Sequence, residues 1–119
     1  MLKFLVDSIN PDGLVIGRNG DCDIPVGTRF SNLRLCRVHK TNNEYRTEDL
    51  GNVASISLTL REVHWYRKLI DLIPRGHTAG LRVDGDGLSE LAEQLRNLPP
   101  GDYLSLTASQ SNSAEQIKA

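Results

Sequence analysis

The sequence has few cysteines and no long apolar run, and each shortage excludes a class of protein. Its 119 residues include two cysteines, Cys22 and Cys36, which are too few for a disulfide framework and lack Cys-x-x-Cys spacing. No apolar run is long enough to span a membrane. Asp7 interrupts the apolar amino-terminal residues before a signal-peptide core could form. We therefore expect a reduced, cytoplasmic protein without a membrane partner.

An excess of charge of one sign is also missing, because the formal net charge is −1 at pH 7. A chain with this balance has no global basic field to hold nucleic acid. We expect no DNA partner, although a local patch of cations can still bind RNA.

The motifs that mark catalytic or metal sites are absent as well. His39, His64 and His77 show neither His-x-His nor His-Glu-x-x-His spacing. Cys22 or Cys36 would need a histidine brought beside it by the fold to act as a nucleophile, and a small buried thiol is the simpler interpretation. We expect no catalytic residue, no metal and no cofactor.

What the chain does contain is a series of short apolar runs that alternate with period two, which predicts β-strands. Two longer runs, 28–40 and 53–66, each lose their apolar phase once, within residues 30–33 and near residues 61–62. The break within 30–33 indicates a bulge or a bend, and one extra residue near 61–62 would restore the facing there, as a β-bulge does. Long strands that bend at bulges allow a small barrel to close.

One segment is predicted to be helical, over about 87–97, because its leucines recur with helical spacing. Asp86 is the expected N-cap, and Pro99-Pro100 end the segment. The polar residues 108–119 predict a disordered C-terminal tail. We therefore predict an all-β fold, a single domain over 1–107 that forms a small closed or partly open β-barrel with one late helix.

The glycine and turn positions resemble those of a known family. The stretch "LVIGRNGDCDIPVGTRF" resembles the V-x-G-x-V-x-x-G-x-I-x-V-G-D core of the second, β-barrel domain of translational GTPases, as in elongation factor Tu. The matching residues there are Gly17, Gly20, Ile24, Val26 and Gly27. Further matches are Ala79-Gly80, Leu81, Val83, Gly85 and the run Gly101-Asp102-Tyr103-Leu104. The resemblance extends over about residues 3–106 and implies a barrel of the translation-protein type.

The departures from this family are as informative as the matches. No G-x-x-x-x-G-K-[ST] motif occurs, so the phosphate-binding loop of a GTPase is missing. The chain therefore resembles the barrel standing alone, with an additional helix. In the family this domain contacts the nucleotide domain and RNA, which implies a protein or RNA partner. The family's contact residues have no match in this sequence.

The segment "REVHWYRK", residues 61–68, is the strongest candidate for a binding surface. It mixes cations with aromatic rings, a composition that suits RNA or an acidic partner. The candidate residues are Arg61, His64, Tyr66, Arg67 and Lys68. Alternation would place Tyr66 beside His64 on the outer face. In the competing interpretation Trp65 fills the barrel interior, Tyr66 covers its outside, and the cations are only solvated.

A second basic stretch could enlarge this surface if its strand pairs with residues 53–66. It contains Arg34, Arg37, His39 and Lys40. The polar residues 41–52 between the two stretches are expected to form a hairpin connection.

Three hypotheses follow from these residues. The first is a non-enzymatic interaction module that binds a protein or RNA partner through residues 61–68 and the neighbouring basic strand. The second is a small enzyme with a site assembled from scattered residues such as His64 and Cys36. The third is an accessory or assembly protein, such as a homodimer formed through a sheet edge.

Overall fold

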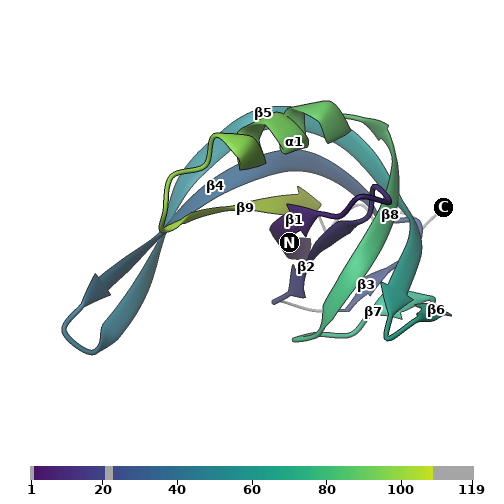
Figure 1. Ribbon diagram of the computed structural model, residues 1–119, viewed down its shortest axis with the longest axis horizontal. Coiled ribbons are helices and arrows are strands. Elements are labelled where there is room, and N and C mark those ends of the chain that lie inside the picture. Colours follow the sequence, from purple (N-terminus) through teal and green to yellow (C-terminus); the bar gives the residue numbers. More distant parts are fainter. Residues whose placement is uncertain (1, 21–22, 109–119) are drawn as a thin grey trace, which may run out of the picture.

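The fold is all-β with one helix, as the sequence predicts. The computed structural model describes residues 2–20 and 23–108 (Figure 1). Its elements are β1 (Leu2–Ile9), β2 (Val15–Asn19), β3 (Ile24–Pro25), β4 (Arg29–Thr41), β5 (Glu44–Trp65), β6 (Lys68–Ile70), β7 (Leu72–Ile73), β8 (Thr78–Asp86), α1 (Leu88–Arg96) and β9 (Asp102–Ala108). Cys22 and residues 109–119 of the predicted tail lie outside the described residues. Ala108, placed in that tail by the sequence, instead ends β9 opposite Leu2.

Six strands form a ring-like sheet in which neighbouring strands are antiparallel. The strand order is β4-β9-β1-β2-β8-β5-β6, and pairing of β4 with β5 joins the two sides of the ring. The short β6 pairs only with the end of β5, and β3 and β7 form a separate two-stranded sheet. Pro25 lies in β3, at the margin of the ring, where its missing N–H does not interrupt a central strand.

The strand registers confirm the bulge predicted near 61–62 and show that the break within 30–33 is also a bulge. The pairing of β4 with β5 shifts between Phe30 and Asn32, and the pairing of β5 with β8 shifts between Leu60 and Glu62. Each extra residue returns the following apolar side chains to the interior, so Val63 is fully buried like Leu60. The two longest strands bend at these places and close the ring.

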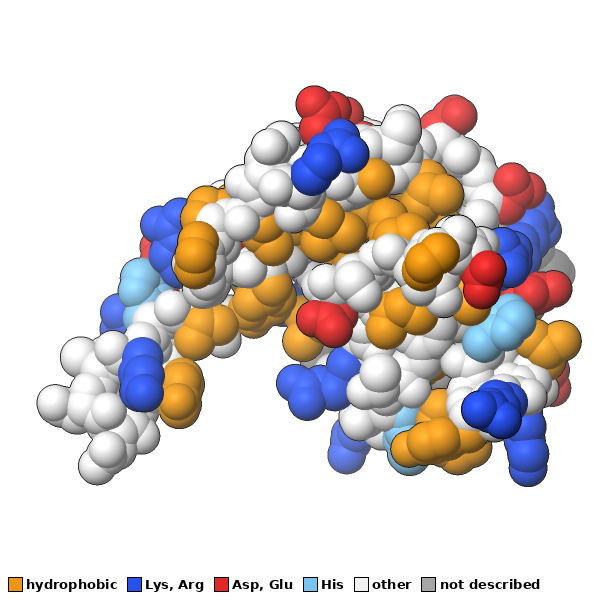
Figure 2. Space-filling view, in the orientation of Figure 1, with side chains coloured by type: hydrophobic (Ala, Val, Ile, Leu, Met, Phe, Trp, Pro, Cys, Tyr) orange, Lys and Arg blue, Asp and Glu red, His pale blue; other side chains and the backbone are white. Residues whose placement is uncertain are grey.

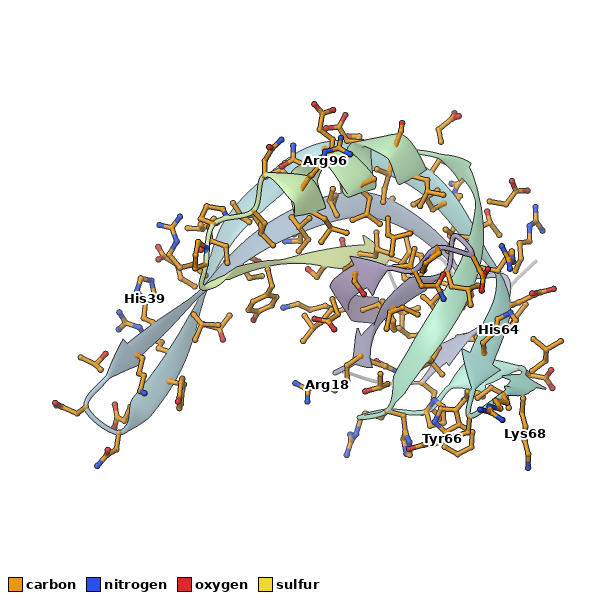
Figure 3. The ribbon with its side chains drawn as sticks, in the orientation of Figure 1. Arg18, His39, His64, Tyr66, Lys68 and Arg96 are labelled. Carbon is orange, nitrogen blue, oxygen red and sulfur yellow. The ribbon has the colours of Figure 1, made fainter. Side chains whose placement is uncertain are left out.

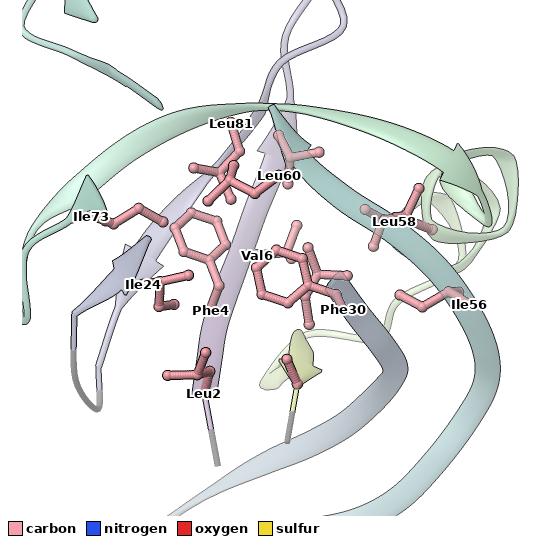
Figure 4. Close-up of a cluster of buried hydrophobic side chains, with 14 of the residues drawn as sticks. Leu2, Phe4, Val6, Ile24, Phe30, Ile56, Leu58, Leu60, Ile73 and Leu81 are labelled. Atoms are coloured by element: carbon pink, nitrogen blue, oxygen red, sulfur yellow. The ribbon is translucent and has the colours of Figure 1, made fainter. Parts of the chain in front are cut away.

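The interior of the ring is filled by apolar side chains from every strand of the ring and from α1 (Figure 4). The largest fully buried side chains are Phe4, Phe30, Ile24, Leu33, Leu58, Leu60, Ile73, Leu81, Leu91, Leu104, Leu106 and Val15. Leu91 comes from α1, so the predicted leucine stripe packs α1 onto this core.

The start of α1 differs from the prediction. Asp86 is not the N-cap; it is the last residue of β8, and Gly87 precedes the helix with φ 119°. A Cβ on Gly87 would lie 2.5 Å from the Ile56 side chain, so only glycine fits this tight left-handed turn.

The predicted hairpin between the two stretches is confirmed, but its connection is shorter than 41–52, because most of that segment is strand. β4 and β5 remain paired down to Thr41 and Glu44, and the turn consists of Asn42 and Asn43, with φ 54° at Asn42. The result is a long hairpin that leaves the ring (Figure 1). We call residues 36–50 of this hairpin the arm.

Candidate functional site

The two predicted basic stretches pair as strands, but the register places their candidate residues at opposite ends of the molecule. Arg37 lies opposite Glu48, and Lys40 lies opposite Tyr45, both in the arm. Residues 61–68 lie at the other end of β5, where it meets β6 and β8. In Figure 3, His39 marks the arm, and His64, Tyr66 and Lys68 mark the distant end. The prediction of one continuous basic patch is therefore wrong.

Arg37, His39 and Lys40 of the arm have partners within the protein. Arg37 donates two hydrogen bonds to the Asp102 carboxylate, at 2.8 and 3.1 Å. These bonds and the charge of Arg37 lower the pKa of Asp102 below its usual value and raise the pKa of Arg37. Lys40 Nζ lies 5.7 Å from the centroid of the Tyr45 ring, and His39 Nε2 lies 2.7 Å from a Glu48 carboxylate oxygen. These contacts give Arg37 and Lys40 a structural role at the arm.

Two side chains early in the 61–68 segment, Arg61 and His64, also have carboxylate partners. Arg61 forms an ion pair of 3.5 Å with Asp84. His64 Nε2 lies 2.9 Å from a Glu62 carboxylate oxygen, and this hydrogen bond lowers the pKa of Glu62. Both side chains therefore have a neighbouring carboxylate as partner.

The last residues of the segment form an exposed turn instead of continuing the strand. Tyr66 and Arg67 connect β5 to β6, and both adopt left-handed backbone conformations with φ 52° and 67°. The prediction that Tyr66 shares a strand face with His64 is wrong for this reason. Tyr66 is 80% exposed. Within the described part of the chain, no ion pair involves Arg67 or Lys68.

Trp65 lies at the base of this turn and not in the core. Its ring contacts Tyr66 edge to face at a centroid distance of 4.8 Å and His77 at 5.4 Å. It does not belong to the buried cluster that fills the ring. The expectation that Trp65 fills the barrel is therefore wrong; it supports the turn from the side.

The contact with His77 brings two further arginines to the same end of the ring. The Asn19 N–H donates to the His77 carbonyl, and the Gly76 N–H donates to the Asn19 carbonyl. Arg18 and Arg75 flank these residues in sequence, and their side chains make no ion pair among the described residues. We name the basic end as Arg18, Tyr66, Arg67, Lys68 and Arg75, together with the Trp65 and His77 rings that contact each other there. Arg18, Tyr66 and Lys68 are labelled in Figure 3.

Sequence reasoning missed Arg18 and Arg75 because each stands alone between uncharged neighbours. Only the strand register Arg18 with Thr78, next to the 74–77 loop, brings them to this end. The basic end also contains carboxylates, and one of them is structural, since the Asp23 carboxylate accepts a hydrogen bond from the Arg75 backbone N–H.

The residues proposed for a scattered catalytic site are not brought together. Cys36 is buried in β4 opposite Asp49 and Tyr103, whereas His64 lies opposite Leu69 and Gly80. Over residues 2–20 and 23–108, no group of three histidine, cysteine or acidic side chains could hold a metal ion. The same residues contain no helix long and apolar enough to cross a membrane.

An open groove of about 480 Å³ lies between the arm and the outer face of the ring, and Figure 2 shows this hollow. The arm side contributes Val38, Tyr45 and Thr47, and the ring side includes Leu5 and Arg18. The groove has mixed chemistry, and Arg18 connects it to the basic end.

Comparison with known proteins adds no further identification, since no protein family, curated protein or solved structure matches the chain.

Proposed function

We propose that the chain is a non-enzymatic RNA-binding module built on a barrel like that of translation factors, and that it holds RNA at the basic end. The ring-like sheet supports this resemblance, as does Gly17, where a Cβ would meet the neighbouring strand β1 and where the family pattern also has glycine. The observation that carries the proposal is the exposed turn formed by Tyr66 and Arg67.

The turn has a backbone cost that its residue types do not lower. A left-handed conformation costs a non-glycine residue roughly 1–2 kcal/mol, and Asn-Gly is the usual solution for two such positions in succession. The chain instead places a tyrosine and an arginine there. Backbone strain of this kind concentrates at functional sites, and here it presents one aromatic ring and one cation to the solvent.

The side chains at the basic end match the chemistry of single-stranded RNA. Bases stack on exposed aromatic rings, and phosphates pair with arginine and lysine. Tyr66 supplies the ring, while Arg67 and Lys68 supply cations that no carboxylate of the described chain neutralises. Arg61 and His64, which have carboxylate partners, are expected to contribute less than these two.

We expect the double substitution Tyr66→Asn with Arg67→Gly to separate stability from binding. It gives the turn its preferred residues and should raise the free energy of unfolding by about 1 kcal/mol. It also removes a stacking ring, worth about 1–3 kcal/mol per base, and one phosphate contact. Affinity for a labelled single-stranded RNA of about 16 nucleotides should fall at least tenfold, measured by fluorescence anisotropy.

Lys40→Ala is the matched control, because it removes one positive charge from the arm and leaves the basic end intact. Its RNA affinity should stay within about threefold of the unaltered protein. A doubly substituted protein that is more stable but binds RNA as well as before would contradict the proposal. Equal losses in both variants would point to unspecific charge attraction.

A further inference from the structure

One edge of the arm, along residues 44–50 of β5, pairs with no strand of the described chain. Residues 44–50 of β5 pair with β4 on one side, whereas the pairing of β5 with β8 on its other side begins only at Ser57. All seven residues are exposed. A strand edge of this kind presents free N–H and C=O groups, which can pair with another strand.

The charges along this edge are complementary to a second copy of themselves. Glu44, Arg46 and Glu48 occupy alternate positions and therefore lie on one face of the hairpin. Natural proteins often protect sheet edges with charges, and charges of one sign would repel a second copy. Here the signs alternate, so an antiparallel copy can place opposite charges against each other.

Symmetry restricts the ways in which two such edges can pair. A twofold axis perpendicular to the sheet keeps each side chain on its own face. The axis must therefore lie between one residue and the same residue of the second copy, so that these two face each other. An axis at Arg46 opposes Arg46 to itself and Glu44 to Glu48. An axis at Glu48 opposes two glutamates. An axis at Thr47 opposes Arg46 to Glu48 of the second copy, twice.

The extent of regular strand favours the same register. Pairing about Thr47 uses 45–49 and stops at Leu50, where the register of β5 with β4 shifts, whereas pairing about Tyr45 opposes Glu44 to Arg46 and reaches the turn after one residue on each side. A pairing centred closer to the ring would have to include Gly51. The φ of Gly51 is 99°, and its N–H donates to the Asp49 carboxylate. The strand is irregular at that point.

We propose that this arm edge binds a second copy of the chain in antiparallel register about Thr47, so that two arms join in one continuous sheet. The surface lies at the opposite end of β5 from the basic end, so the dimer does not depend on RNA binding. Two Arg46–Glu48 cross-strand pairs fix its register.

Charge reversal tests this pairing on the full chain by sedimentation equilibrium. Arg46→Glu and Glu48→Arg should each weaken dimerisation about tenfold, since each turns two attractive cross-strand pairs into repulsive ones. The combined substitution restores opposite charges and should return the dimer constant to within about threefold. A protein that remains monomeric at millimolar concentration, or a double variant as weak as the single ones, would overturn the proposal.

A cysteine on the symmetry axis tests the register itself. In a protein carrying Cys22→Ser and Cys36→Ala, Thr47→Cys should form a disulfide-linked dimer under mild oxidation, because the two residues face each other directly. Thr41→Cys, which is equally part of the arm but lies on β4, is the control and should remain unlinked. Linking through position 41 and not through position 47 would contradict this geometry.

Discussion

Replacing Gly17 by alanine is expected to destabilise the protein by more than about 3 kcal/mol. Gly17 lies in β2 opposite Val6, where a Cβ would overlap the Leu5 carbonyl oxygen and approach the Phe4 ring to 2.6 Å. The carbonyl is part of the backbone and the ring is fully buried, so neither can move aside without disrupting the sheet. Urea unfolding followed by circular dichroism measures the loss.

Gly20→Ala is the matched control, since both glycines belong to the pattern that resembles the translational GTPase domain. No atom lies within 4 Å of a Cβ placed on Gly20. The free energy of unfolding should therefore change by less than about 0.5 kcal/mol. If Gly17→Ala abolishes folding altogether while Gly20→Ala expresses normally, the steric argument still holds. Equal effects of the two substitutions would contradict it.

Phe30→Ala is expected to cost about 3–5 kcal/mol of unfolding free energy. The Phe30 side chain has no exposed surface and lies in the centre of the ring, next to the bulge that bends β4 (Figure 4). Truncation leaves a cavity that the closed sheet cannot fill by collapsing. Thermal and urea unfolding of the purified variant provide the measurement.

Trp65→Ala is the informative comparison, because it removes a larger side chain from outside the core. Trp65 packs on Tyr66 and His77 at the basic end, so its removal should cost less than half of the Phe30 value and weaken RNA binding. If Trp65→Ala lowers the free energy of unfolding as much as Phe30→Ala does, Trp65 is part of the core and this placement is wrong.

The sequence predicts where the strands of this sheet bend better than it predicts how far they extend. A break in apolar alternation within a long strand has one simple remedy, an extra residue, and both bulges lie where the phase breaks. Burial of one face is what makes this pattern visible. The core of the ring could therefore be predicted from residues such as Phe4, Leu60 and Val63.

The arm could not be predicted in this way, because no burial distinguishes its two faces. Residues 44–50 are exposed on both faces, and polar side chains fill consecutive positions from Arg46 to Asp49, so the period-two signal disappears. The sequence of such a strand therefore predicts a loop. The same limit applies to the helix cap, since the sequence does not show that Ile56 lies too close to position 87 for any side chain.

The candidate site was predicted in part. The segment 61–68 does contain the exposed cations Arg67 and Lys68, but the sequence could not separate them from Arg61, which has a carboxylate partner in β8. That distinction depends on strand register. The left-handed turn was equally hidden, since Tyr-Arg carries none of the residues that normally mark such a turn.

The dependence of RNA affinity on salt tests the central claim most directly. The logarithm of the association constant of a single-stranded RNA is measured against the logarithm of salt concentration for the unaltered protein and for Arg67→Ala with Lys68→Ala. Loss of two phosphate contacts should reduce the slope by about 1.4. Parallel lines for the two proteins would show that Arg67 and Lys68 do not contact phosphate, and would contradict RNA binding at the basic end.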